Sequence, residues 1–256
     1  MRVHETGPAD AETIVFLHGV AASAGMWDAH AERFAGYHCL RPDFPGFGES
    51  AGEPWTTIGG VSSEIARIIR TRAGGRAHVV GMSLGGIVAI DLVATEPELV
   101  DHLIVDGAGV LPIPALALAK LALRLAPLVI KSDIAVNIVA SSIGVPKGNR
   151  AGIRRDYGRM SSAAFVAALT QALDYREPPG LAGVWCPTLF VAGGREPSTT
   201  RRSQWELTRR MPNAAAAVVP RRWHSWIAAE PDLHCRMVEA WISDRPLPDA
   251  LAPVDP

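Results

Sequence analysis

Ser83 stands between two glycines, in the run Gly81-Met82-Ser83-Leu84-Gly85. A short apolar run, residues 77–80, precedes it, and a helix-like run, residues 84–95, follows. Where a strand turns abruptly into a helix, the residues two before and two after the corner come close together, which favours glycine at both. The corner side chain is then exposed beside the amides that begin the helix. The pattern predicts a nucleophilic serine, although such motifs also occur in purely structural turns.

A serine hydroxyl needs a base within hydrogen-bond reach, because its alkoxide does not form at neutral pH. His224 is the candidate, since it follows the strand-like run 215–219 and precedes the helix-like run 231–243. A loop in that position lies at the same sheet edge as Ser83 if the sheet is parallel. The other histidines, His18 among them, are interpreted as structural. The spacing therefore predicts His224 as the general base.

Two carboxylates could orient that histidine. Glu196 follows a strand-like run and lies between Ser83 and His224, which is the chain order expected of such a triad. Asp106 ends the preceding strand-like run, at the same edge. Either carboxylate could instead cap a helix or pair with an arginine, and Arg195 stands beside Glu196. We predict Glu196 as the acid and keep Asp106 as the alternative.

Acyl transfer also needs hydrogen-bond donors for the negative oxygen that develops on the attacked carbonyl. Backbone N–H groups serve well, because they are fixed in place before the reaction. Leu84 directly follows the serine, and Val20 lies just after the strand-like run 13–17. We predict the backbone N–H groups of Val20 and Leu84 as this oxyanion hole.

Strand-like and helix-like runs alternate along the chain, which is typical of an α/β fold with a mostly parallel sheet flanked by helices. Each apolar run ends in polar or glycine-rich residues, and these gather at the carboxyl edge, where such sheets bind ligands. The expected strands are 13–17, 37–41, 77–80, 102–105, 188–192 and 215–219, and the expected helices lie around 27–35, 59–72, 84–95, 200–211 and 231–243.

The segment 111–183 breaks this alternation, because it shows helical apolar periodicity and no convincing strand. It is inserted after the fourth strong strand candidate. We predict that it forms a helical cap, or lid, over the carboxyl edge of a core domain made of residues 1–110 and 184–244. Residues 245–256 are rich in proline and are expected to form a poorly ordered tail.

Residues 114–125 of this segment are strongly apolar, with Lys120 and Arg124 four positions apart on one face. An amphipathic helix of this kind could lie in a membrane interface. Two cations are few for that role, so the sequence favours a cap helix that packs on its neighbours.

Composition narrows the class of protein. The length of 256 residues suits one α/β domain with an insertion, and the net charge of −1 provides no general attraction for nucleic acid. Three widely spaced cysteines indicate neither a disulfide framework nor a metal site. No leader peptide, membrane-spanning run or nucleotide fingerprint is recognisable. We expect a cytoplasmic protein that acts on a small molecule without a metal, a cofactor or stable membrane insertion.

Several stretches of the chain together match one known family: Leu17-His18-Gly19, Trp27, residues 41–50, the stretch around Ser83, residues 186–193 and Trp223-His224. On these residues the chain resembles the serine-nucleophile, esterase- or lipase-like branch of the α/β-hydrolase fold superfamily. The family usually has aspartate where Glu196 stands, and only 17 residues precede His18, so the first one or two strands of the family's sheet are expected to be short or absent.

This resemblance implies hydrolysis of a hydrophobic carboxylic ester, lactone or thioester through an acyl-enzyme on Ser83. The serine argues against the relatives that use an aspartate nucleophile. A C–C bond hydrolase, a biosynthetic cyclase or thioesterase, and a non-catalytic ligand-binding protein are the alternatives. Trp226, Trp205 and Phe165 are candidates to line the substrate pocket, although core packing is the more common fate of such residues.

Overall fold

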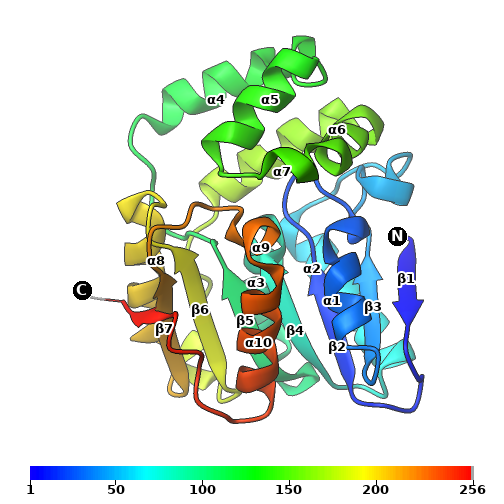
Figure 1. Ribbon diagram of the computed structural model, residues 1–256, viewed down its shortest axis with the longest axis vertical. Helices are drawn as coiled ribbons and strands as arrows, with labels where there is room; N and C mark the ends of the chain where they lie inside the picture. The colour runs from blue at the N-terminus through cyan, green and yellow to red at the C-terminus, as the bar shows by residue number, and fades with distance from the viewer. Residues whose placement is uncertain (255–256) are drawn as a thin grey trace.

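The apolar runs of the chain assemble into one sheet with the order β1-β3-β2-β4-β5-β6-β7-β8 (Figure 1). The computed structural model describes residues 1–254. Its inner strands are parallel, and only the pairs at the two edges are antiparallel. The strands are β1 (Val3–Thr6), β2 (Thr13–Leu17), β3 (His38–Pro42), β4 (Ala77–Met82), β5 (Val100–Asp106), β6 (Thr188–Gly193), β7 (Ala214–Val219) and β8 (Ala252–Pro253). The fold is therefore the predicted α/β class.

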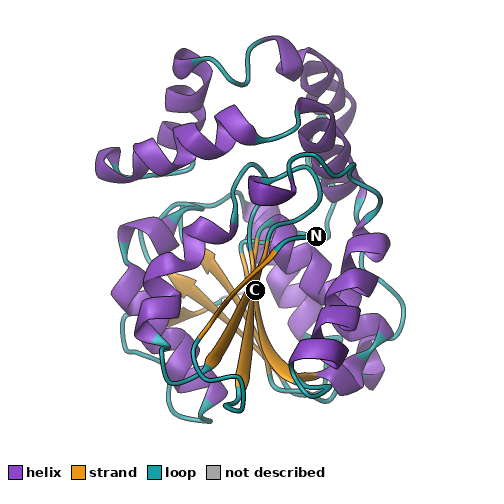
Figure 2. Cartoon of the chain, turned by 90° about the vertical axis from the view of Figure 1, so that its right-hand side faces the viewer, coloured by secondary structure: helices purple, strands orange, loops and turns teal. Residues whose placement is uncertain are grey.

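Helices cover both faces of this sheet (Figure 2). Successive strand residues point to opposite faces, so Leu17 of β2 packs beside α2 and α3, whereas Phe16 packs beside α1 and α10. The core helices are α1 (Asp28–Arg33), α2 (Ile58–Arg72), α3 (Leu84–Thr95), α8 (Ser198–Thr208), α9 (Trp226–Ala229) and α10 (Pro231–Ile242).

Helix α2 illustrates why these segments are helical. The Thr57 side chain accepts a hydrogen bond from the Gly60 N–H and so satisfies one of the free amides at the helix start. Val61, Ile65 and Ile68 recur at helical spacing and are buried against the sheet. A polar cap and an apolar stripe together place this helix on one face.

Residues 111–183, which we call the helical segment, lie between β5 and β6. The helical segment contains α4 (Leu116–Leu125), α5 (Asp133–Ser142), α6 (Arg150–Arg159) and α7 (Ser162–Asp174). Helix α7 contacts α3, which begins at the carboxyl end of β4. Figure 1 shows the four helices stacked beyond one end of the sheet, with α4 and α5 outermost.

Both ends of the chain complete the sheet. Strand β1 has four residues and pairs with β3, in keeping with the expectation of a short first strand. The expectation of a disordered tail is wrong for residues 252–253, which form β8 against the edge of β7. Leu247 and Leu251 pack on the core and hold this stretch in place, so the open edge of β7 is covered. Residues 255–256 of the predicted tail lie outside the described residues.

Within residues 1–254, no helix combines the length and the apolar character that crossing a bilayer requires.

Candidate active site

Ser83 occupies a strained corner between β4 and α3. Its φ of 55° and ψ of −112° are rare for a residue with a side chain. The Ser83 N–H donates a 2.7 Å hydrogen bond to the carbonyl of Asp106, which fixes the corner to β5. A Cβ on Gly81 would lie 2.3 Å from the Gly85 carbonyl oxygen, and one on Gly85 would lie 2.2 Å from the Leu17 carbonyl oxygen. Both glycines are thus required by close backbone approach.

Val20 and Leu84 lie beside Ser83 in the lining of one cavity. In the part of the chain that the structure describes, neither residue's backbone N–H donates a hydrogen bond. His18 holds the Val20 loop, because its Nδ1 donates to the Gly19 carbonyl at 2.8 Å and its Nε2 accepts from the Phe44 N–H at 2.9 Å. Burial lowers the pKa of His18, so the ring stays neutral in this structural role.

His224 and Glu196 form a hydrogen-bonded pair at the carboxyl edge. The His224 Nδ1 donates to Glu196 Oε2 at 2.8 Å, and Glu196 Oε1 accepts from the Gly193 N–H at 2.9 Å. The carboxylate is buried, whereas 24% of the His224 side chain is exposed. Among residues 1–254, Arg195 makes no ion pair with Glu196, so the alternative of a simple surface pair does not describe this carboxylate.

Gly107 brings this pair against the backbone that holds Ser83. Its φ is +64°, and a Cβ there would lie 2.7 Å from His224 Nδ1 and 3.4 Å from Glu196 Oε1. The imidazole therefore packs directly on the residue after Asp106, whose carbonyl binds the Ser83 N–H. This close approach places the His224–Glu196 pair at the sheet edge where Ser83 lies, although within residues 1–254 no hydrogen bond joins Ser83 to His224.

The charge on His224 depends on opposing effects. Burial lowers its pKa, but the hydrogen bond to Glu196 and the negative charges of Glu196 and Asp106 outweigh burial. The net result is a pKa raised above the ordinary histidine value.

Asp106, the alternative acid, points elsewhere. Its Oδ1 accepts a 3.1 Å hydrogen bond from Trp226 Nε1, and its Oδ2 lies 3.7 Å from Nε2 of the buried His234. Burial, together with the negative charge of Glu196, raises the pKa of Asp106 well above the ordinary aspartate value. The structure thus places Glu196, and not Asp106, in hydrogen-bond contact with His224.

A cavity of about 160 Å³ opens at Ser83. The three aromatic candidates for its lining are not among the residues that line it. Trp226 is buried on Asp106, Trp205 stacks under Arg209, and Phe165 packs in the core. The lining instead comes from five separate stretches of chain, and the sequence alone does not show that all five meet. They are Val20, residues 83–84 with Ile87, residues 107–109 with Leu111 and Ile113, Leu169 with residues 172–173, and residues 199–200 with Ser203.

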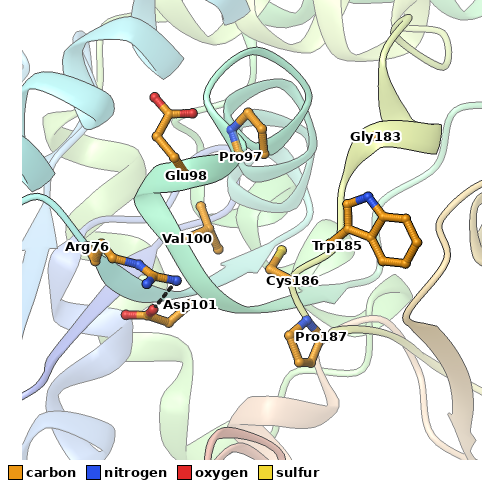
Figure 3. Close-up of a pocket in the computed structure, with 9 residues that line it drawn as sticks. All are labelled: Arg76, Pro97, Glu98, Val100, Asp101, Gly183, Trp185, Cys186 and Pro187. Carbon is orange, nitrogen blue, oxygen red and sulfur yellow. Dashed lines mark ion pairs between the residues drawn. The ribbon is translucent and has the colours of Figure 1, made fainter.

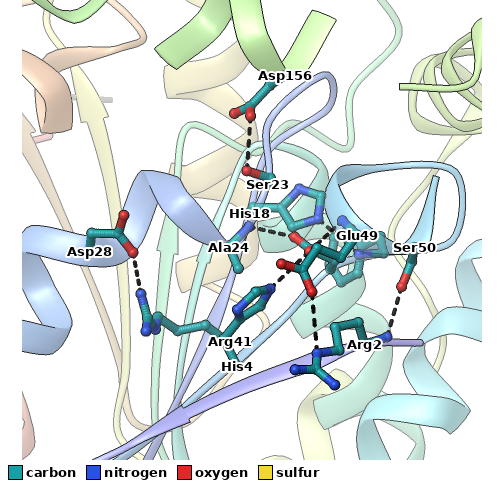
Figure 4. Close-up of polar contacts among 12 residues, drawn as sticks. Arg2, His4, His18, Ser23, Ala24, Asp28, Arg41, Glu49, Ser50 and Asp156 are labelled. Atoms are coloured by element: carbon teal, nitrogen blue, oxygen red, sulfur yellow. Dashed lines mark hydrogen bonds and ion pairs between the residues drawn. The ribbon is translucent and has the colours of Figure 1, made fainter. Parts of the chain in front are cut away.

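Polar contacts of Ser23, Ala24 and Glu49, which are labelled in Figure 4, support the loops beside the cavity. The Asp43 carboxylate accepts hydrogen bonds from the N–H groups of Ala24, at 2.6 Å, and Glu49, at 2.8 Å. The Ser23 hydroxyl donates to Asp156 of α6 at 3.1 Å. This bond links the helical segment to the loop that carries Val20.

A larger hollow, about 400 Å³, lies at the opposite edge of the sheet (Figure 3). It is lined by residues at the amino ends of β5 and β6, including an ion pair between Arg76 and Asp101 with an N–O distance of 2.7 Å. The predicted catalytic residues Ser83, Glu196 and His224 are not among the residues that line it. Nowhere in residues 1–254 do three or more potential metal ligands cluster.

Comparison with known proteins identifies the family of the chain. The model of the alpha/beta hydrolase family matches residues 14–253. An AB hydrolase superfamily protein of Gibberella zeae is 30% identical, over 93% of this chain and 82% of its own length. An esterase of Mycobacterium tuberculosis is 39% identical over 37% of this chain, and a 2-hydroxy-6-oxononadienedioate/2-hydroxy-6-oxononatrienedioate hydrolase of Paraburkholderia phymatum is 38% identical over 43%. These two matches span only 32% and 41% of the relatives' own lengths.

Solved structures share the fold across the chain. The enol-lactonase from Burkholderia xenovorans LB400 superposes with a TM-score of 0.79 at 17% identity, covering 94% of this chain and 96% of its own. A thermophilic esterase from Thermogutta terrifontis superposes with a TM-score of 0.74 at 20% identity, covering 95% and 93% of the two chains.

Proposed function

The chain belongs to the α/β-hydrolase family and is an enzyme of it, and from this premise we propose that it hydrolyses small apolar carboxylic esters through a Ser83–His224–Glu196 triad. The observation that carries the proposal is the 2.8 Å hydrogen bond between Glu196 and His224, packed on the backbone beside Ser83. In this arrangement Glu196 holds the Nδ1–H tautomer, which leaves the other ring nitrogen to act as the base.

The reaction then follows from these positions. Ser83 Oγ attacks the ester carbonyl while His224 Nε2 takes the hydroxyl proton, and the Glu196 carboxylate stabilises the imidazolium. The N–H groups of Val20 and Leu84 donate to the oxygen that becomes negative. His224 returns its proton to the leaving alcohol, and a water molecule activated by the same base cleaves the acyl-enzyme to give the acid and free Ser83.

The cavity indicates the class of acyl group. Its lining has no charged residue, and its polar side chains are hydroxyls such as Thr199, Thr200 and Ser203. A volume of about 160 Å³ resembles that of a cavity able to hold benzene, so an acyl chain of roughly six carbons would fill it. A dicarboxylate would need cations in the lining. These features favour neutral esters or lactones over the C–C hydrolysis of dioates that one relative's name describes.

The helical segment supplies the wall opposite the sheet. The cavity is lined by Leu169, Ala172 and Leu173 of α7, and also by Leu111 and Ile113 at the start of the helical segment. In the proposal this segment, residues 111–183, is the cap that excludes water from the acyl group. Water exclusion strengthens the hydrogen bonds to the developing oxyanion.

The test is covalent labelling followed by a substrate series. A fluorophosphonate probe should add once to the folded protein, at Ser83, and the addition should be lost in His224→Ala. Among p-nitrophenyl esters from acetate to dodecanoate, kcat/KM should be highest near butyrate and hexanoate, and a monosuccinate ester should react at least about tenfold more slowly than butyrate. Folded protein that resists the probe would refute the triad. Equal rates for butyrate and succinate would refute the neutral-acyl assignment.

The raised pKa of His224 sets the pH dependence. Only the neutral imidazole can take the serine proton, and a raised pKa keeps the ring protonated to higher pH. We therefore expect kcat/KM to rise with pH through a midpoint above the ordinary histidine value of 6.5. A pH–rate profile with p-nitrophenyl butyrate measures this midpoint, and a value below 6.5 would mean that burial outweighs the two carboxylates.

A further inference from the structure

The outermost helices of the helical segment expose a large apolar surface. We call this surface the outer apolar face. Each of its members is more than half exposed, although each is a large aliphatic residue. The members come from α4, α5 and the turn between them, at the end of the molecule farthest from the amino ends of the strands (Figures 1 and 2). They are Leu118, Leu121, Leu125, Leu128, Val129, Ile134 and Ile138.

Helix α4 presents its apolar stripe outward. Leu118, Leu121 and Leu125 follow helical spacing and are exposed, whereas Leu123 is buried toward the rest of the segment. A surface helix normally turns such a stripe toward the core. We expected α4 to pack on its neighbours. One side of the helix does contact α7, but the stripe of Leu118, Leu121 and Leu125 is exposed to solvent. Large apolar side chains exposed together on neighbouring elements are typical of a site of interaction.

The helical segment carries an excess of positive charge, because residues 111–183 contain nine lysines and arginines and four carboxylates. Residues 111–155 contain all three lysines of the chain and a single carboxylate, Asp133, which pairs with Arg154 at 2.6 Å. Among the described residues, Arg124, Lys131 and Lys147 form no ion pair with a carboxylate. The whole chain has a net charge of −1, so this excess is local. Of the other cations in this range, Lys120 pairs with Asp174 of α7 and Arg155 pairs with Asp156, so the exposed cations of α4 and the turn after it, Arg124 and Lys131, are the ones available to a partner.

We propose that the outer apolar face, together with Arg124 and Lys131, docks the protein on an anionic lipid surface. Exposed leucines beside lysine and arginine are the combination that binds a helix in the plane of a membrane interface. The charge of the helical segment favours a bilayer over a second copy of the chain as the partner of this face. A second copy of the chain would bring two positively charged segments together, whereas an anionic bilayer complements them.

The docking has a consequence for the substrate, which rests on the proposed function. The helical segment carries both the outer apolar face and part of the Ser83 cavity wall, including Leu111 and Leu169. Docking therefore brings the cavity close to the bilayer, where apolar esters concentrate. Lipid binding itself needs no turnover and can be measured separately.

The experiment measures flotation of the full-length protein with vesicles of phosphatidylcholine alone and of phosphatidylcholine with one quarter phosphatidylglycerol. We expect binding to the mixed vesicles that weakens as salt is raised. Leu121→Gln/Leu125→Gln removes apolar surface without changing charge, and Arg124→Gln/Lys131→Gln removes charge without changing the leucines. The charge pair should weaken binding at least about tenfold, because one surface cation contributes on the order of 1 kcal/mol. The leucine pair should also weaken it at least about tenfold, because it removes apolar surface that enters the membrane interface.

Trp185→Gln is the matched control, because Trp185 is 66% exposed but lies at the amino end of β6, beside the hollow of Figure 3. It should bind as the parent does, and all variants should keep their rate with p-nitrophenyl butyrate and their labelling by the probe. Absence of flotation with the mixed vesicles would overturn the proposal, as would equal loss in the control. So would a dimer, seen by light scattering, that the leucine pair dissociates. If the leucine variant misfolds, the charge variant still tests whether the protein binds anionic vesicles through this face.

Discussion

Ser83→Ala and His224→Ala should each lower kcat/KM for p-nitrophenyl butyrate by roughly a million-fold. The reason is that neither group of the proposed pair works without the other, since the hydroxyl is not nucleophilic until the imidazole takes its proton. The double variant should therefore be no slower than either single variant. Residual activity above the uncatalysed rate would come from the N–H groups of Val20 and Leu84.

Two variants serve as matched controls. Ser62→Ala removes a buried hydroxyl from α2, and His102→Gln removes an imidazole from β5 near the opposite edge of the sheet. Both should keep kcat/KM within about twofold, because surface and structural polar changes away from the site seldom affect chemistry directly. If Ser83→Ala and Ser62→Ala lose equally little, Ser83 is not the nucleophile.

Glu196→Gln should lower kcat by roughly a thousand- to ten-thousand-fold, whereas Asp106→Asn should lower it less than about tenfold. The carboxylate at 2.8 Å from His224 Nδ1 sets the tautomer and stabilises the imidazolium, and an amide does neither. Asp106 accepts no hydrogen bond from that histidine, and an asparagine Oδ1 could still accept the hydrogen bond from Trp226.

The comparison is made by single-turnover kinetics on the two purified variants, with thermal unfolding as a check that each folds. Glu196→Asp supplies a graded case: it keeps the charge but shortens the side chain by one methylene, so its rate should fall between those of Glu196→Gln and the parent. A large loss in Asp106→Asn with none in Glu196→Gln would transfer the acid role to Asp106.

The amino-acid sequence by itself was enough to predict the α/β class and the approximate boundaries of most core elements. Strands such as β2 and helices such as α3 begin and end where the apolar runs do, because hydrophobic periodicity and turn residues are local properties. The pattern around Ser83 is local as well. Gly81 and Gly85 are required by backbone atoms that approach each other across one turn and one neighbouring strand.

Other features depend on contacts between distant residues, and only the tertiary structure decided them. Asp106 ends β5, and Glu196 follows the neighbouring strand β6 at the same edge, so the sequence left both possible. In the structure His224 packs on Gly107 and forms its hydrogen bond with Glu196. Ala252 pairs with β7 because the edge of that strand is open, and the proline-rich sequence of the tail does not indicate this pairing. In the same way, the periodicity of α4 identified an apolar stripe but not its direction. Amphipathicity shows that a helix has two faces, and its neighbours in space decide which face meets solvent.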